Sequence, residues 1–142
     1  MEARIKAFHE LSCDELFEIY KLRVSVFVVE QSCAYQEVDD EDKKAYHIAL
    51  YENGELMAYC RVFPKAAHES LIGRVIAVKR RCGLGTKVVS LAIDTARECL
   101  GAERIAVEAQ TYAAPMYEKL GFVKRSEEYL EDGIPHISMI LK

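Results

Sequence analysis

The sequence has 142 residues, the usual length of one folded domain, and can bury a substantial apolar core without a stapling disulfide. Its formal net charge of −4 argues against a surface built as a whole for nucleic acid, because phosphate neutralisation needs excess Lys and Arg. No apolar run approaches the roughly 20 residues that a membrane span requires. We therefore expect one soluble domain over residues 1–142, with no nucleic-acid or membrane partner.

The cysteines and the acidic residues give no sign of a metal site. The five cysteines are widely spaced, form no C-x-x-C pair and follow no secretory leader. This pattern favours reduced, mostly buried thiols in a cytoplasmic protein over a disulfide or zinc framework. The acidic stretch from Glu37 to Asp42 lacks the glycine and the distant glutamate of a calcium loop. We expect a cytoplasmic protein that holds no metal.

The first third of the chain predicts a strand, a helix and an acidic loop. Residues 4–9 alternate weakly, which favours a strand. Ser12 stands before an apolar pattern of helical period, and Glu15 is placed to complete a capping box with it. We expect a helix over residues 13–28 and a loop or short irregular helix over residues 32–45.

The middle of the chain carries the clearest local signal. Residues 46–64 predict two strands joined by Asn53 and Gly54, a dipeptide that favours a tight hairpin because both residues tolerate positive φ. The β-branched run 71–78 predicts a buried strand, and apolar residues at three- to four-residue spacing predict a helix over 84–100.

The last third returns to strands around one short helix. We expect a strand over 103–109, a helix within 112–122 closed by Gly121, and strands near 122–129 and 136–141. This alternation predicts an α/β (α+β) protein with a mixed sheet and helices on its faces, because parallel neighbours need crossover helices.

A basic turn lies between the predicted strand 71–78 and the predicted helix 84–100. Glycines let a ligand approach the main chain, and the unpaired N–H groups and dipole of a helix start attract an anion. Four basic side chains would reinforce a site for more than one phosphate group. The basic side chains and the two glycines are Lys79, Arg80, Arg81, Lys87, Gly83 and Gly85.

Two common phosphate motifs do not fit this turn. A P-loop needs Lys directly after its second glycine, where this chain has Thr86, and the dinucleotide fingerprint needs a small residue where it has Val88. Residues 80–85, RRCGLG, instead resemble the R/Q-x-x-G-x-G/A signature of the GNAT N-acetyltransferases. Residues 114–122, APMYEKLGF, resemble a second segment of that family, and the likeness to its ElaA-like branch covers nearly the whole chain.

The resemblance implies a mostly antiparallel sheet of roughly six to seven strands with about four helices. It also implies an enzyme that moves an acetyl group from acetyl-CoA to a primary amine of a small molecule or peptide, by direct attack in a ternary complex. A homodimer follows only by analogy with such relatives. The implied cofactor-binding residues are Ile76, Ala77, Val78, Arg80, Arg81, Cys82, Gly83, Leu84, Gly85, Thr86 and Tyr117.

The chemistry needs an acid, an oxyanion donor and a base. Tyr117 matches the family's acid, and an N–H at Val78 or its neighbour matches the oxyanion donor. The base stays open: many family members place a Glu on the central strand, where this chain has Arg74. The alternatives are Glu108, His47 and His136.

The acceptor side is less determined by the sequence. The acidic stretch is either a solvated loop or an attractor for a cationic amine. Arg23 and Phe27, with Glu37-x-Asp39-x-x-Asp42, also resemble acyl-homoserine-lactone synthases, although an Arg23–carboxylate ion pair that orders the loop explains the same residues. The candidate substrate-binding residues are Arg23, Glu30, Glu37, Asp39, Arg74 and His136.

Other functions stay open at this point. Without the central-strand Glu, the domain could be a non-catalytic acyl-CoA sensor. A nucleic-acid module is disfavoured because the basic patch is small and lacks interleaved aromatic residues. Cys82 as a covalent acyl carrier is disfavoured because it would lie beside the pyrophosphate, far from the thioester.

Overall fold

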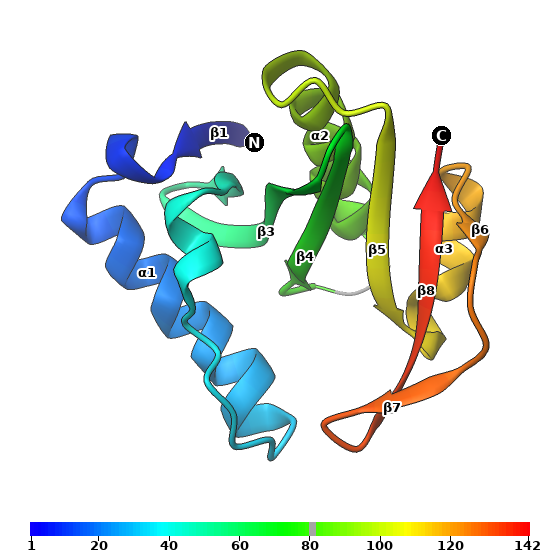
Figure 1. The fold of residues 1–142 in the computed structure, drawn as a ribbon. Coiled ribbons are helices and arrows are strands. Elements are labelled where there is room, and N and C mark those ends of the chain that lie inside the picture. Colours follow the sequence, from blue (N-terminus) through cyan, green and yellow to red (C-terminus); the bar gives the residue numbers. More distant parts are fainter. Residues whose placement is uncertain (80–81) are drawn as a thin grey trace.

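The computed structural model describes residues 1–79 and 82–142, and its strands form one sheet. The sheet order is β1-β2-β3-β4-β5-β8-β6, with β7 pairing with β8 (Figure 1). All pairs are antiparallel except β4–β5, whose strands are parallel because helix α2 carries the chain between them. The elements are β1 (Glu2–Ala7), α1 (Cys13–Val24), β2 (Tyr46–Glu52), β3 (Glu55–Ala66), β4 (Glu69–Ala77), α2 (Leu84–Cys99), β5 (Arg104–Gln110), α3 (Ala114–Lys119), β6 (Val123–Lys124), β7 (Tyr129–Glu131) and β8 (Ile134–Leu141).

The predicted mixed, mostly antiparallel architecture is confirmed, with different element counts. In the described part of the chain there are eight strands and three α-helices. The extra strand arises because the region predicted as one strand over 122–129 contains both β6 and β7, and β7 forms a hairpin with β8 through Asp132 and Gly133, both at positive φ. There is no separate fourth α-helix in the described residues, because the segment Ser25–Glu30 continues α1 as a π-helix.

The predicted local signals at the N-terminal helix and the first hairpin are confirmed. Ser12 Oγ accepts a hydrogen bond from the Glu15 amide at 3.1 Å, and Glu15 Oε1 accepts one from the Ser12 amide at 2.9 Å. Asn53 and Gly54 both have positive φ at the β2–β3 turn. Strand β4 begins at Glu69, two residues earlier than predicted, because it forms a second hairpin with β3.

Strand β4 contains a bulge, and beyond it the sheet divides. Tyr59 of β3 pairs with Ile76 and Arg61 with Gly73, so β4 has one extra residue in this interval. Arg74 lies within the bulge at φ +55°. The ladder between β4 and β5 ends at the pair Ile72–Val107, and the two strands then diverge toward their C-terminal ends (Figure 1).

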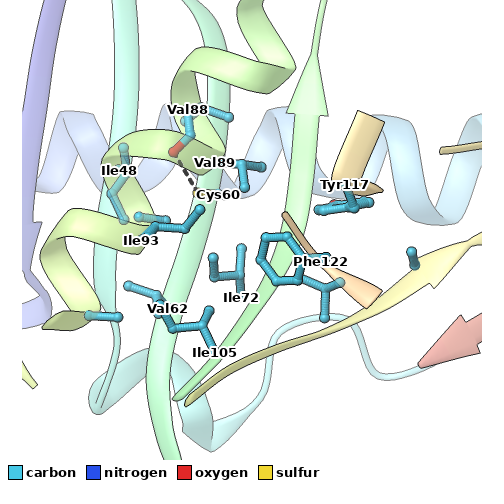
Figure 2. Close-up of a cluster of buried hydrophobic side chains, with 14 of the residues drawn as sticks. Ile48, Cys60, Val62, Ile72, Val88, Val89, Ile93, Ile105, Tyr117 and Phe122 are labelled. Carbon is cyan, nitrogen blue, oxygen red and sulfur yellow. Dashed lines mark hydrogen bonds between the residues drawn. The ribbon is translucent and has the colours of Figure 1, made fainter. Parts of the chain in front are cut away.

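The main core lies between the sheet and helix α2. Figure 2 shows Val88, Val89 and Ile93 of α2 packed in one cluster with side chains of β2, β3, β4 and β5, and Tyr117 and Phe122 at one end of it. The rings of Tyr117 and Phe122 meet edge to face, with centroids 5.6 Å apart. Helix α1 covers the opposite face, where Ile19 packs with Tyr59 in a smaller cluster. The core therefore fixes the ring of Tyr117.

Helix α3 is held in place by the turn that follows it. Gly121 has φ +101°, and the Phe122 amide donates to the Tyr117 carbonyl at 3.1 Å. A Cβ atom at Gly121 would also approach Leu141 Cδ1 to 3.1 Å. The predicted helix end at Gly121 is thereby confirmed, because no side chain fits this backbone conformation without strain.

Two further observations concern the helices and the cysteines. No helix within the described ranges is long and apolar enough to cross a membrane. The expectation of mostly buried thiols is wrong: Cys60 is buried, but Cys13, Cys82 and Cys99 are exposed. Cys13 and Cys99 are the first residue of α1 and the last of α2, where terminal turns face solvent.

Candidate active site

A cavity of about 550 Å³ lies where β4 and β5 part. Gly85 of α2 and Met116 and Tyr117 of α3 line it on one side of the sheet. Arg74 of the β4 bulge and His136 of β8 also line it. The cavity therefore reaches from the start of α2, through the divided sheet, toward the segment that follows α1.

The turn at the start of α2 exposes its main chain. Gly83 is the N-cap at φ +73°, and its carbonyl accepts from the Lys87 amide at 3.0 Å. No described side chain caps the helix, so its first amides have no intrahelical acceptor. Cys82 and Thr86 are exposed, whereas the Leu84 side chain packs in the core and leaves only its amide for a ligand. Arg80 and Arg81 lie outside the described residues.

Gly85 is required by a close contact between α2 and α3. A Cβ atom there would stand 3.1 Å from Met116 Sδ, which is tighter than ordinary van der Waals contact. Both residues line the cavity. A side chain at position 85 would therefore push on the helix that carries Tyr117.

The edge of β4 distinguishes between the amides that the sequence left open for the oxyanion donor. The Val78 N–H donates to the Met57 carbonyl at 3.0 Å, so it is used within the sheet. Hydrogen bonding alternates along an antiparallel pair, so Ile76 also faces β3, while Ala77 turns its N–H and C=O toward the gap beside β5. Of the predicted stretch Ile76 to Val78, only Ala77 is placed to bind a ligand through its main chain, so of the predicted alternatives, Val78 or its neighbour, the neighbour Ala77 fits the oxyanion donor and Val78 does not.

Tyr117 lies at the cavity with a protonated hydroxyl. Its side chain is 5% exposed and lines the cavity. Burial raises the pKa of its hydroxyl far above the ordinary value, with smaller contributions from Cys60 and Tyr112. No described residue forms a hydrogen bond with this hydroxyl. The phenol therefore keeps its proton at neutral pH and has no competing partner on the protein.

His136 presents one ring nitrogen as a base. Its Nδ1 lies 2.7 Å from the Ile134 carbonyl, which can only accept, so Nδ1 carries the proton and Nε2 keeps a lone pair. Tyr129 stacks on the ring, with centroids 6.0 Å apart. Nε2 is 3.6 Å from Glu131 Oε2. The ring is oriented, and it lines the cavity.

Glu108 also lines the cavity, from β5, but it is partly neutralised. Lys65 Nζ lies 3.5 Å from its Oε1 atom. The register places Glu108 and Gln110 on one face of β5, and Gln110 pairs with His136. Glu108 therefore adds negative charge to the face of the sheet that carries His136.

The acidic segment is neutralised by buried arginines. Arg23 is fully buried, with Nε 2.9 Å from Glu37 Oε2 and Nη1 2.7 Å from Asp42 Oδ1. Arg61 Nη1 lies 2.6 Å from Asp39 Oδ1 and 2.9 Å from Asp42 Oδ1. The predicted ion pair that orders this loop is confirmed. Arg23 and Glu37 are thus removed from direct contact with a substrate, which corrects their assignment as substrate-binding residues.

The charges of this cluster are coupled. Burial raises the pKa of Asp42, but hydrogen bonds and charge from Arg23 and Arg61 outweigh burial and lower it overall. The same balance lowers the pKa of Asp39, which lines the cavity. Asp39 and Asp42 are therefore held as carboxylates by arginines, which occupy the positions that a cationic amine would otherwise take.

Two further predicted site residues lie elsewhere. His47 is buried away from the cavity lining: its Nε2 donates to the Asp42 carbonyl at 2.9 Å, and its Nδ1 accepts from the Tyr59 hydroxyl at 2.7 Å. Burial lowers the pKa of its imidazole, so it is neutral, and both nitrogens are engaged. His47 is therefore corrected as a base. Glu30 is exposed at the end of the π-helix, outside the cavity lining, and is corrected as a substrate-binding residue.

Several residues of the site were not predicted from the sequence. Arg61 had a usable signal, because it is the one charged residue in the apolar run 56–64 of β3. Tyr129 and Glu131 had none, because they reach His136 only through the β7–β8 hairpin. Within the described residues, no group of three or more His, Cys, Asp or Glu side chains is arranged to hold a metal ion.

Comparisons with known proteins agree with this geometry. The family model described as the acetyltransferase (GNAT) domain matches residues 15–142. A UPF0039 protein of Schizosaccharomyces pombe is 43% identical over 146 residues, covering 100% of this chain and 97% of that protein. Protein ElaA of Escherichia coli is 36% identical over 136 residues, covering 92% of this chain and 89% of ElaA.

Solved structures show the same likeness over the whole chain. The crystal structure of Escherichia coli ElaA has a TM-score of 0.93 at 34% identity and covers 100% of both chains. The crystal structure of an acyl-CoA N-acyltransferase from Pseudomonas aeruginosa has a TM-score of 0.90 at 35% identity and covers 99% of each chain.

Replacing Arg23 tests the role of the charge cluster. We expect Arg23→Gln to lower the free energy of unfolding by about 3–5 kcal/mol, because it leaves buried carboxylates underpaired. Urea unfolding measures the loss. Arg104→Gln, which removes a partly exposed partner of Glu69, is the control and should cost less than about 1 kcal/mol. Equal losses in the two variants would contradict the structural role assigned to Arg23.

Proposed function

Because this chain belongs to the GNAT acetyltransferase family, we propose that it is an enzyme that transfers the acetyl group of acetyl-CoA to a primary amine of a small molecule or peptide. The family model and the ElaA relatives confirm the predicted ElaA-like branch. The observation that carries the proposal is one cavity lined by a protonated phenol, the open edge of β4 and an oriented imidazole. These are the acid, the oxyanion donor and the base that the sequence alone could not assemble.

The described residues fit acetyl-CoA. The uncapped start of α2 from Gly83 to Thr86 would hold the pyrophosphate through backbone amides, because Gly83 and Gly85 place no side chain over them. Ala77, on the free edge of β4, would bind the pantetheine arm as an added strand binds a sheet. Tyr117 lies across the same cavity.

The chain's own residues can carry each proton of the transfer. Acetyl-CoA supplies a thioester carbonyl that an amine can attack. The Ala77 amide, directed into the gap, would donate to the oxygen that becomes negative. His136 Nε2 would take a proton from the amine, directly or through a water. The Tyr117 hydroxyl, which is protonated at neutral pH, would give its proton to the sulfur as the carbon–sulfur bond breaks.

Charge around His136 favours a cationic acceptor. A primary amine is protonated in neutral solution, so it enters the cavity as a cation and loses its proton there. Glu131 Oε2 lies 3.6 Å from His136 Nε2 and has no basic partner other than this imidazole among the described residues, whereas Glu108 is paired with Lys65 and Glu37, Asp39 and Asp42 are paired with arginines. We therefore assign the attraction of the amine mainly to Glu131.

The alternatives lose support from the same residues. A non-catalytic sensor would need the cofactor turn but no acid or base in the cavity, and both Tyr117 and His136 line it. Arg23, Glu37 and Asp42, which resemble residues of acyl-homoserine-lactone synthases, form buried ion pairs with one another. They therefore give no reason to prefer synthase activity. A homodimer and a cytoplasmic location stay predictions from the sequence.

Release of free CoA thiol from acetyl-CoA, measured over a panel of mono-, di- and polyamines, tests the proposal. We expect transfer to at least one amine and a decrease of roughly ten- to a thousandfold in kcat for Tyr117→Phe. The CoA Kd, measured by calorimetry, should not change. The variant should fold, because the hydroxyl has no hydrogen-bond partner among the described residues. CoA binding without transfer to any amine would favour the sensor, and unchanged kcat would remove Tyr117 from the mechanism.

Replacing His136 tests the assignment of the base. We expect His136→Gln to lower kcat/KM for the amine roughly a hundredfold and to leave the Kd for acetyl-CoA unchanged, because Nε2 is the nitrogen that would take the proton from the amine. Steady-state kinetics over amine concentration and calorimetry with acetyl-CoA measure this. His47→Gln, which alters a buried histidine outside the cavity lining, should lower kcat/KM far less. A His136→Gln enzyme with wild-type kcat/KM would show that another group is the base.

A further inference from the structure

Arg74 lies at the position in β4 where the sheet divides. It lies in the β4 bulge at φ +55°, a left-handed conformation that residues other than Gly, Asn and Asp rarely adopt. Its neighbour Gly73 follows Ile72, the last β4 residue paired with β5. An arginine at such a position has a cost that the surrounding contacts must offset.

The side chain of Arg74 is engaged by the segment that follows α1. Its Nη2 donates to the Glu37 carbonyl at 2.8 Å, and its Nε lies 2.6 Å from Glu37 Oε2. Nη2 also lies 3.5 Å from Asp39 Oδ2, and the guanidinium stands over the Tyr35 ring at 5.6 Å. Arg74 therefore holds both ends of the short stretch from Tyr35 to Asp39.

These contacts join two walls of one cavity. Tyr35 and Asp39 line it from the segment after α1, and Val75 and Ala77 line it from β4. We infer that Arg74 is a positioning residue that fixes the acceptor wall, Tyr35 to Asp39, against the strand whose amide faces the thioester. The inference rests on the proposed function for the identity of these two walls.

The carboxylates that Arg74 contacts each have a second arginine partner. Without it, Glu37 keeps its contacts with Arg23, and Asp39 keeps its contacts with Arg61. No buried carboxylate would lose its only partner, in contrast to the loss of Arg23. Arg74 is also unable to serve as the missing base of the central strand, because a guanidinium stays protonated.

Arg74→Gly is the sharpest test, because glycine accepts the left-handed backbone and removes only the side chain. We expect kcat/KM for the amine to fall roughly ten- to a hundredfold from misplacement of the acceptor wall. The Kd for CoA and the Tm should stay near the wild-type values. Methylguanidinium at millimolar concentration should restore part of the lost rate, and Arg74→Lys should retain part of it. Arg104→Gln, at the opposite end of the sheet, is the control and should leave the rate unchanged.

Amide hydrogen exchange gives a readout that does not require activity. In Arg74→Gly we expect faster exchange at residues 37–39 and also at 75–77, with both slowed again by methylguanidinium. Wild-type kinetics in the variant, a loss of rate that methylguanidinium does not rescue, or faster exchange confined to residues 37–39 would overturn the inference. If the wild-type protein transfers acetyl to no amine, the proposed function fails separately, and the exchange experiment still decides whether Arg74 joins the two walls.

Discussion

The parting of β4 from β5 after Ile72 is the constraint on which the site depends. A continuous ladder would use the Ala77 amide within the sheet and would close the passage between its two faces. The bulge at Arg74 changes the direction of β4, so the strand keeps its pairing with β3 while it leaves β5. This divergence opens the cavity and leaves the Ala77 amide free. It also lets Tyr117 line the same cavity.

The buried charge cluster holds the other side of the cavity in place. Arg23, from α1, and Arg61, from β3, engage carboxylates of one irregular segment that has little apolar surface of its own. Charged side chains at such depth persist only when they are paired. The cluster therefore replaces a hydrophobic contact that the acidic segment cannot make, and it gives the segment a defined conformation beside the cavity.

The sequence predicted the features that depend on local chemistry. The capping box of Ser12, the hairpin at Asn53 and Gly54 and the helix end at Gly121 each follow from the conformations open to a few neighbouring residues. The family resemblance added the roles proposed for the glycine turn and Tyr117. The family resemblance could not predict three features that depend on pairing between distant strands. These are the β4 bulge that engages Val78 and frees Ala77, the burial of His47, and the approach of Glu131 to His136.

The most direct measurement is a titration of ¹⁵N-labelled protein with acetyl-CoA, followed by amide chemical shifts. A large shift at Ala77 and at Gly83 to Thr86, with a much smaller shift at Val78, is expected because the Val78 N–H is already bonded to Met57. Saturating acetyl-CoA that leaves Ala77 unaffected, or that shifts Val78 instead, would contradict the claim that the divided sheet receives the thioester arm.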